Sequence, residues 1–443
     1  MKPGKVGLYT CGPTVYDVAH IGNFRTFLFE DLLKRYLIFR GFKVHHIMNI
    51  TDVDDKTIRK ALGQDVKLAE ITAKYTDHFF KDLERLKILP ADNYPRATAH
   101  IQEMIDMIQS LVDKEFAYVM KDGSVFFAID AYQEYGRLVK LDFSEQKITE
   151  RVSNDEYDLS KPQDFALWKA WKEEDGNIYW DSPWGPGRPG WHIECSAMST
   201  AYLGNHFDIH CGGIDNLFPH HENEIAQTIC ATDSTFVNYW LHSEHLVVEG
   251  GKMSKSLGNF FGIRDLFETG MTSETIRFIL LSAHYRSKVL FSPDKQKEAF
   301  KTIRRIGELI TRLETVTDKK SVVDEFPSDF EKFIAAMDDD LNTPEALAIF
   351  FEWIRKTNLA LDKGDFSAVE AAKSLNFISA VDEIMKIVPT EATVPESILA
   401  LVRQREVARK KKDWQEADDI RDKLLKSGWI IKDTPRGSRV QKV

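Results

Sequence analysis

The sequence predicts an α/β fold built on a parallel sheet, followed by an all-helical region. Three observations support this prediction. Residues 6–50 form the pattern strand, helix, strand; helix and strand patterns alternate again from residue 191 to about residue 251; and nearly every segment beyond about residue 290 favours a helix. At 443 residues the chain is long for one hydrophobic core, so two to four domains are expected.

The β-α-β unit begins with the apolar stretch VGLYTC, which ends at Cys11. The next segment carries apolar side chains every three or four residues and ends at Gly41, which predicts a helix. The second strand, KVHHIMNIT, ends at Thr51. Because ligands bind at the carboxyl ends of parallel strands, Cys11 and Thr51 are expected at the ligand-binding edge of the sheet.

The remaining segments follow in order. Residues 66–115 have a helical pattern, and residues 116–190 break into short strands and loops that we interpret as an insertion within the sheet domain. A strand pattern resumes at WHIECSAMST, so Cys195 is expected to end a strand at the same sheet edge as Cys11. The last 45 residues predict two helices and a short basic end.

Composition excludes several classes of protein. Hydrophobic residues make up 43% and charged residues 29% of the chain, as in ordinary folded domains. No uninterrupted apolar run of about 18 residues is present, and the start lacks the apolar region of a secretory signal. The four cysteines are far apart. We therefore expect a cytoplasmic protein with no membrane span and no disulfide framework.

The charge distribution is uneven. The net charge is −10, but residues 399–443 contain 13 Lys/Arg against 7 Asp/Glu, which gives +6 for this end and −16 for the rest. A basic end on an acidic chain indicates contact with a polyanion. A solvated helix face explains the charge equally well.

The stretch FPHHENE indicates a metal site. If Pro219 opens a helix, His220 and Glu224 lie four residues apart on one face. Together with Cys11 and Cys195, they form a reasonable zinc ligand set. The alternative is that His220 is a core histidine and Glu224 a surface acid. By helix geometry His221 is expected to point elsewhere, with a structural role or a role in supporting the ligands.

Two loops have the character of phosphate-binding segments. In CGPTVYDVAHIGN, His20 and Asn23 stand at the start of the long helix, where free N–H groups attract anions. In GGKMSKSLGN, Lys252 and Lys255 lie between glycines, and such a cationic loop would stabilise a departing pyrophosphate. Either segment alone is weak evidence, since ordinary loops contain such residues.

HIGN and KMSKS resemble the two signature motifs of the class I aminoacyl-tRNA synthetases, in the same order. The wider set YTCGPTVYDVAHIGN, NITDVDDK, RPGWHIECSAMS and GGIDNLFPHHENE resembles the cysteinyl-tRNA synthetase family over nearly the whole chain. The resemblance implies a Rossmann-type parallel-sheet catalytic domain with an insertion, an all-α helical bundle and a small C-terminal anticodon-binding domain. The implied boundaries are 1–115 and 191–245 for the two halves of the catalytic domain, 116–190 for the connective insertion, 246–292 for the KMSKS loop and stem-contact region, 293–390 for the helical bundle and 391–443 for the anticodon-binding domain.

The resemblance also implies roles for individual residues. The zinc ligands would be Cys11, Cys195, His220 and Glu224. The catalytic residues would be His20, Asn23, Lys252 and Lys255, and the same four would bind ATP with Pro13, Gly22 and Asp215. The cysteine pocket would contain Gly12, Thr51 and Trp191. The anticodon contacts would be Arg409, Trp414, Asp418 and Asp433; for Trp414, packing between helices is an equally good interpretation.

The implied activity is ligation of L-cysteine to tRNA-Cys. ATP and Mg²⁺ would activate the amino acid as cysteinyl-adenylate, and the cysteinyl group would pass to the 3′ end of the tRNA. One Zn²⁺ per chain would recognise the substrate thiolate, because a hydrophobic pocket separates side chains this small by only about 1–3 kcal/mol. A monomer is expected.

Two departures from the family pattern are present. The resemblance implies about 20 further residues ahead of PGKVGLYTCGP. Cys211 stands where the family has glycine, close enough to the predicted site to be an adventitious ligand or to be oxidised.

Three alternatives remain open. The cysteine ligase of mycothiol synthesis shares the zinc site but lacks the anticodon-binding end, so the basic end counts against it. An RNA-binding protein with structural zinc has no need of HIGN and KMSKS. A nucleotidylyltransferase of the same superfamily has no need of four zinc ligands.

Overall fold

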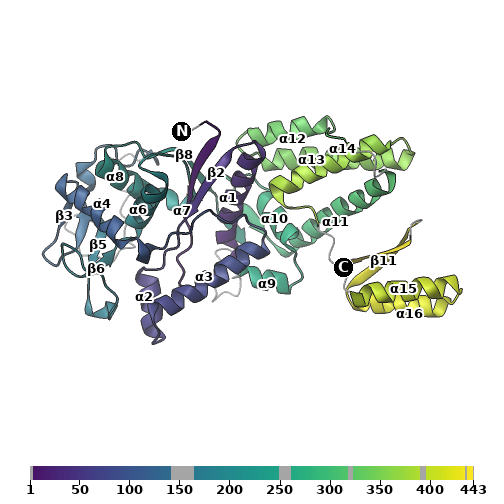
Figure 1. Cartoon of the computed structure of the whole chain (residues 1–443), viewed down its shortest axis with the longest axis horizontal. Helices are drawn as coiled ribbons and strands as arrows, with labels where there is room; N and C mark the ends of the chain where they lie inside the picture. The colour runs from purple at the N-terminus through teal and green to yellow at the C-terminus, as the bar shows by residue number, and fades with distance from the viewer. Residues whose placement is uncertain are drawn as a thin grey trace. The chain divides into compact units, whose positions relative to one another are not determined.

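The computed structural model describes residues 3–140, 164–248, 261–317, 323–389, 396–434 and 437–442. The chain divides into two compact units, Met1–Val388 and Pro389–Val443, which we describe separately (Figure 1).

A four-stranded parallel sheet forms the centre of the first unit. Its strand order is β2-β1-β7-β8, with bounds β1 Lys5–Thr10, β2 Lys43–Met48, β7 Phe207–Gly213 and β8 Val237–Ser243. Helix α1 (Ile21–Phe39) connects β1 to β2. Because β2 and β7 lie on opposite sides of β1, the strand order reverses there, and a ligand crevice is expected at the carboxyl ends of β1 and β7.

A second sheet, antiparallel and of order β3-β4-β5-β6, lies between β2 and β7 in the sequence. Helices α4, α6 and α8 pack together beside it. The bounds in this part are α2 Asp55–Gly63, α3 Leu68–Arg85, η1 Ala97–Ala99, α4 Ile101–Asp113, β3 Ala117–Val119, β4 Val125–Phe127, η2 Ile129–Ala131, β5 Phe165–Ala170, η3 Glu173–Asp175, β6 Gly187–Pro189, α6 Trp191–Leu203, α7 Ile214–Asn216, η4 Leu217–His221 and α8 Glu222–Thr232.

The segment WHIECSAMST is a helix, α6, so the prediction of a strand ending at Cys195 was wrong. Strand β6 ends at Pro189, and Gly190 caps the new helix. Residues 192–199 are buried on every side of α6, so the helix lacks the amphipathic period by which a surface helix is recognised. Cys195 still reaches the expected sheet edge, from a helix.

The remainder of the first unit is mainly helical. Its core is continuous with the apolar face of α1, which confirms the predicted α/β fold with a helical second part. The bounds are β9 Leu246–Val248, α9 Ile263–Glu268, α10 Ser273–Leu281, β10 Val289–Phe291, α11 Pro293–Val316, α12 Asp329–Asp338, α13 Thr343–Lys363 and α14 Ala368–Met385, with β9 and β10 pairing in parallel. Among the described residues, no helix is long and apolar enough to cross a membrane.

A buried carboxylate joins α1 to this helical region. Asp31 accepts hydrogen bonds from Arg35 Nε at 2.8 Å, Arg277 Nη2 at 2.7 Å and the Leu89 amide at 2.8 Å. Arg277, fully buried on α10, also donates to the backbone carbonyl of Met385 at the end of α14. One acid therefore ties α1, the loop after α3, α10 and α14 together.

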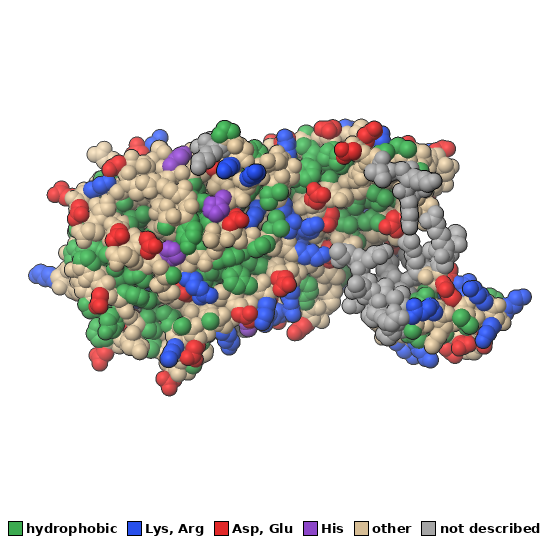
Figure 2. Space-filling model, viewed as in Figure 1, with side chains coloured by type: hydrophobic (Ala, Val, Ile, Leu, Met, Phe, Trp, Pro, Cys, Tyr) green, Lys and Arg blue, Asp and Glu red, His purple; other side chains and the backbone are tan. Residues whose placement is uncertain are grey.

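The second unit contains helices α15 (Glu396–Lys410) and α16 (Trp414–Lys426) and an antiparallel hairpin of β11 (Trp429–Thr434) and β12 (Gly437–Lys442). The basic end predicted after the two helices is thus paired as a hairpin. Its Trp429 and Ile431 alternate inward to pack on the helices. Figure 2 shows Lys and Arg side chains among Asp and Glu on one face of this unit.

We predict that Asp31→Asn lowers the free energy of unfolding by about 3–5 kcal/mol, because it leaves two buried arginines without their counter-charge. The measurement is urea denaturation of the full chain. Asp77→Asn is the matched control, since Asp77 pairs with Lys81 on the surface at 2.7 Å and such pairs contribute about 0–1 kcal/mol. Equal losses for the two variants would contradict the prediction.

Candidate metal centre and active site

The end of strand β1 places Cys11 at the crevice. The Cys11 amide donates to the carbonyl of Cys211 on β7 at 3.3 Å, and the amide of Gly12 donates to Asn49 Oδ1 at 3.0 Å. A Cβ atom at Gly12 would lie 1.7 Å from the carbonyl oxygen of Asn49. Only glycine lets the chain after Cys11 approach the segment after β2 this closely.

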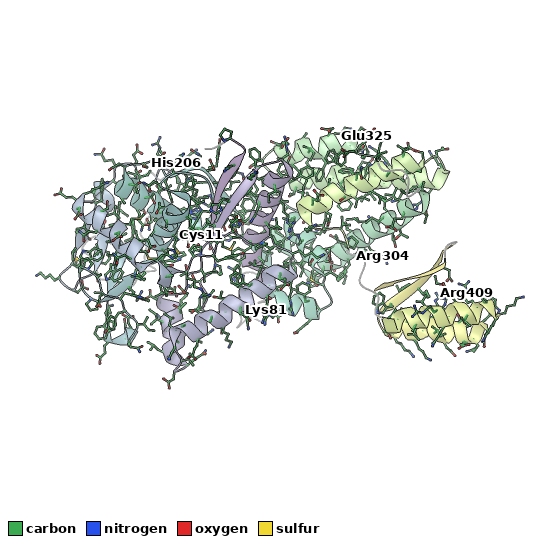
Figure 3. The ribbon with its side chains drawn as sticks, in the orientation of Figure 1. Cys11, Lys81, His206, Arg304, Glu325 and Arg409 are labelled. Atoms are coloured by element: carbon green, nitrogen blue, oxygen red, sulfur yellow. The ribbon has the colours of Figure 1, made fainter. Side chains whose placement is uncertain are left out.

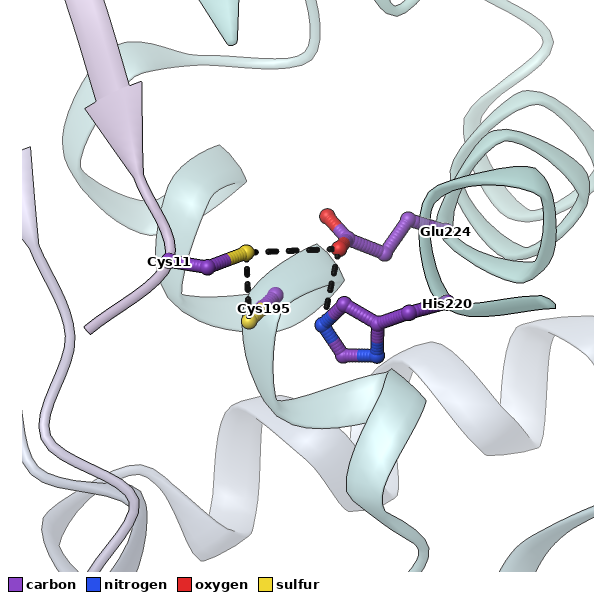
Figure 4. A group of neighbouring side chains, drawn as sticks. All are labelled: Cys11, Cys195, His220 and Glu224. Atoms are coloured by element: carbon purple, nitrogen blue, oxygen red, sulfur yellow. Dashed lines mark hydrogen bonds and ion pairs between the residues drawn. The ribbon is translucent and has the colours of Figure 1, made fainter. Parts of the chain in front are cut away.

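Three side chains converge on that of Cys11 (Figure 4). Ligand atoms of Cys11, Cys195, His220 and Glu224 all lie within 4.8 Å of one another, and all four residues are buried. Cys11 Sγ is 4.0 Å from both Cys195 Sγ and Glu224 Oε1, and His220 Nε2 is 3.1 Å from the same Glu224 oxygen. The structure therefore brings together the four residues expected as metal ligands, from β1, α6, η4 and α8.

Without a cation, each of the four groups is driven towards its neutral form. Burial raises the pKa of the Cys11 thiol and of the Glu224 carboxyl and lowers that of His220 well below its ordinary value. The hydrogen bond with Cys11, together with burial, raises the pKa of the Cys195 thiol well above its ordinary value. A divalent ion reverses this preference for both thiols and the carboxyl, because its charge stabilises their anions. Two sulfurs, one nitrogen and one oxygen suit zinc.

Two further histidines contact this cluster. His210 and His221 form a second possible ligand group with the same Cys11 and Glu224. His221 Nε2 is 3.3 Å from Cys11 Sγ, so the expectation that His221 points elsewhere was wrong. The backbone of Phe218, just before this turn, is not helical. Ideal helix geometry therefore predicts the wrong direction for the His221 side chain. Sequence reasoning missed His210; its place just before the end of β7, beside β1, was the available signal.

The three residues expected in the cysteine pocket are each connected to a residue of the cluster or to its neighbour in the chain. Gly12 adjoins Cys11. Thr51 is buried and donates to Glu194 Oε2 at 2.9 Å, which places it beside the residue preceding Cys195. Trp191 is 42% exposed, and its ring stacks on His220 with centroids 4.1 Å apart. One wall of the cluster is therefore an exposed aromatic ring.

The residues expected at ATP lie at the start of α1 and beside it. His20 caps α1: its Nδ1 accepts from the Asn23 amide at 3.2 Å, and Asn23 Oδ1 accepts from the His20 amide at 3.1 Å. Burial lowers the pKa of His20, and Asp215 opposes this shift. Gly22 lies in the first turn, and the Pro13 carbonyl accepts from the Thr51 amide at 3.2 Å. Lys252 and Lys255 lie outside the described residues.

Cys211 and Cys230 are not members of either possible ligand group among the described residues. Cys211 packs in the core with α1, and burial raises the pKa of its thiol well above its ordinary value. Cys230 packs in the core beside the antiparallel sheet.

The second unit brings two of the four expected anticodon residues together. Asp433 forms ion pairs with Arg409 and, at 2.8 Å, with Arg405. The hydrogen bond from Arg405 lowers the pKa of Asp433. Trp414 opens α16 and is 59% exposed, so the alternative that it packs between helices was wrong. Asp418 lies one turn further along α16, also exposed.

Comparisons with known proteins agree along the whole chain. Residues 1–301 match the family of tRNA synthetases class I (C) catalytic domains, residues 332–388 the DALR domain and residues 392–441 the cysteinyl-tRNA ligase anticodon binding domain. A cysteine–tRNA ligase of Chlamydia felis is 47% identical over 446 residues, covering 99% of this chain and 94% of that protein. A cysteine–tRNA ligase of Brachyspira hyodysenteriae is 46% identical over 452 residues, covering 99% and 95%.

Solved structures show the same fold at low sequence identity. Methionyl-tRNA synthetase of Mycobacterium tuberculosis in complex with methionyl-adenylate matches with a TM-score of 0.64 at 14% identity, covering 86% of this chain and 92% of that one. The ternary complex of an Agrobacterium radiobacter LeuRS matches with a TM-score of 0.61 at 12% identity, covering 87% and 84%.

We predict that Gly12→Ala weakens zinc binding about 10-fold or more, because the added Cβ must displace the backbone at Asn49 and with it Cys11. Competition with a chromogenic chelator measures this affinity. Gly63→Ala is the matched control, since a Cβ there meets no atom within 4 Å. Unchanged zinc affinity in Gly12→Ala would show that the close approach does not position Cys11.

Proposed function

The chain belongs to the cysteine–tRNA ligase family of the class I aminoacyl-tRNA synthetases, and on that premise we propose that its buried Cys/His/Glu cluster binds a zinc ion that recognises the substrate thiolate. The observation that carries this proposal is the convergence of Cys11, Cys195, His220 and Glu224 at the carboxyl ends of β1 and β7. Ligands of parallel α/β sheets bind at this place.

Zinc, when bound, would supply a soft electrophilic centre for which a thiolate is a strong ligand, a serine hydroxyl a weak one and a methyl group none. Such a distinction is needed because a hydrophobic pocket separates side chains this small by only about 1–3 kcal/mol. Translation requires selectivity of roughly 10⁴–10⁵, or roughly 5.5–7 kcal/mol.

The surroundings of the cluster suit a small amino acid. Gly12 follows Cys11 and lies in close contact with the backbone of Asn49. Thr51 and Glu194 are buried and hydrogen-bonded to one another, and the exposed Trp191 ring stacks on His220. We assign Gly12, Thr51 and Trp191 to this pocket. Trp191 would exclude water once cysteine is bound.

Activation of cysteine needs positioning rather than a covalent enzyme intermediate. The cysteine carboxylate attacks the α-phosphate of ATP, and pyrophosphate departs with Mg²⁺. His20, Asn23 and the amides at the start of α1 would hold the phosphates, with Pro13, Gly22 and Asp215 nearby. Lys252 and Lys255 would neutralise the leaving pyrophosphate.

Transfer of the cysteinyl group to the 3′ end of tRNA-Cys follows. In the second unit, Arg409, Trp414, Asp418 and Asp433 would contact the anticodon, where exposed aromatic rings stack on unpaired bases. The cysteine ligase of mycothiol synthesis and the nucleotidylyltransferases are disfavoured by the match of residues 392–441 to an anticodon binding domain. We propose a monomer that acts in the cytoplasm.

Removal of zinc with a chelator is expected to abolish cysteine-dependent exchange of pyrophosphate into ATP while circular dichroism stays nearly unchanged, because the buried environment favours the uncharged form of each of the four ligands. Readdition of zinc restores exchange. The control is a chelator already saturated with zinc. A stripped protein that still prefers cysteine over serine would refute the proposed role of zinc.

Trp414→Ala is expected to raise the KM for tRNA-Cys, because about 1–3 kcal/mol of stacking energy with a base is lost. Cysteine-dependent pyrophosphate exchange is expected to stay unchanged. Aminoacylation at varied tRNA concentration measures this effect. Val407→Ala serves as the control, because Val407 is a similarly exposed apolar side chain of the same unit. The assignment of Trp414 fails if the two variants behave alike.

A further inference from the structure

The two carboxylate oxygens of Glu224 have different partners. Oε1 faces the cluster, 3.1 Å from His220 Nε2 and 4.0 Å from Cys11 Sγ. Oε2 is 2.9 Å from Nε2 of His210, which is fully buried, as is Glu224. The carboxylate would thus offer one oxygen to a metal ion, while the other oxygen is in contact with His210.

His210 is well placed to hold that oxygen. It lies on β7, which pairs with β1 on one side and with β8 on the other, so its backbone is fixed by the sheet. Its ring stacks on Trp240 with centroids 4.7 Å apart and meets Tyr9 edge-on at 5.0 Å. Residues that do not bind the metal but form hydrogen bonds with its ligands orient those ligands.

The number of oxygens that Glu224 supplies matters for the proposed reaction, on which this inference rests. Zinc sites that act on a substrate keep one position open and sometimes expand to five ligands. Four protein atoms plus one substrate sulfur reach that number. A second oxygen from Glu224 would occupy the fifth position, and the cysteine thiolate would have to displace it.

We propose that His210 is a positioning residue that restricts Glu224 to coordination through one oxygen and so keeps a position open for the substrate thiolate. His192 makes a comparable contact with the histidine ligand, since His192 Nδ1 is 2.8 Å from His220 Nδ1. An imidazole can direct only one nitrogen at the cluster, whereas a carboxylate can direct two oxygens. Control over the number of ligand atoms therefore falls to His210.

The rival interpretation is that His210 is itself a ligand, together with His221, in the second possible ligand group. The two interpretations differ in what happens to the metal when the His210 imidazole is removed. Removal of a ligand lowers the affinity for the metal, whereas removal of a positioning residue leaves the metal bound with altered coordination.

The test uses the full chain loaded with Co²⁺ in place of zinc, because the visible absorption of Co²⁺ weakens as ligands are added. His210→Phe keeps the ring contacts with Trp240 and removes the hydrogen bond to Glu224. His210→Gln retains a side-chain amide near the position of Nε2 that can form a hydrogen bond with Glu224, whereas the shorter His210→Asn does not reach Glu224. His206→Ala, an exposed histidine that Figure 3 labels apart from Cys11, is the control.

Three quantities are measured for each variant: metal bound per chain, the Co²⁺ spectrum with and without cysteine, and the KM and kcat for cysteine in pyrophosphate exchange. His210→Phe and His210→Asn are expected to keep one metal per chain, to show weaker Co²⁺ absorption before cysteine is added and to need about 10-fold more cysteine for the spectral change. The KM for cysteine rises accordingly, with a smaller effect on kcat. His210→Gln and His206→Ala resemble the parent chain.

Loss of the metal from the Phe, Asn and Gln variants would overturn the proposal in favour of His210 as a ligand. An unchanged spectrum and cysteine titration in the Phe and Asn variants would also overturn it. If His210→Phe does not fold, the comparison of Asn with Gln decides. Failure of the proposed function itself is recognised separately, because the parent chain would then bind no Co²⁺ or show no spectral response to cysteine.

Discussion

The buried carboxylate of Asp31 is the interaction on which the arrangement of the first unit depends. By accepting from Arg35, Arg277 and the Leu89 amide, it fixes helix α1 between the parallel sheet and the helical region. Helix α1 begins at His20, so the same contact sets where its amino end lies relative to the ends of β1 and β7. A buried carboxylate within α1 thus aligns the proposed phosphate-binding turn with the proposed metal centre.

Features with a local cause were predictable from the sequence. The β-α-β unit follows from apolar spacing and from Gly41, and Cys11 follows from its place at the end of the first strand. The four-residue spacing of His220 and Glu224 brings them together within one short segment, where Nε2 and Oε1 lie 3.1 Å apart. These predictions needed only periodicities and the rule that parallel strands present ligands at their carboxyl ends.

Features that depend on tertiary packing were not predictable. Helix α6 is buried on all sides, so its sequence carries no helical period, and Cys195 was assigned to a strand. His221 reaches Cys11 because the backbone at Phe218 departs from helical geometry just before it. His210 contacts Glu224 across 14 residues and from another element, and no local pattern indicates such a contact. The residues between 249 and 260, which contain KMSKS, lie outside the described part of the chain.

The burial of the four expected metal ligands has a consequence for the life of the protein in a cell. The buried environment favours the uncharged form of each of these groups, which lowers the cost of burying them, so the polypeptide is expected to reach its native fold before zinc binds. Under the proposed function, zinc starvation would leave the amount of enzyme unchanged and lower the fraction able to charge tRNA. A cell could then recover translation of cysteine codons by remetallation, without new synthesis of the protein.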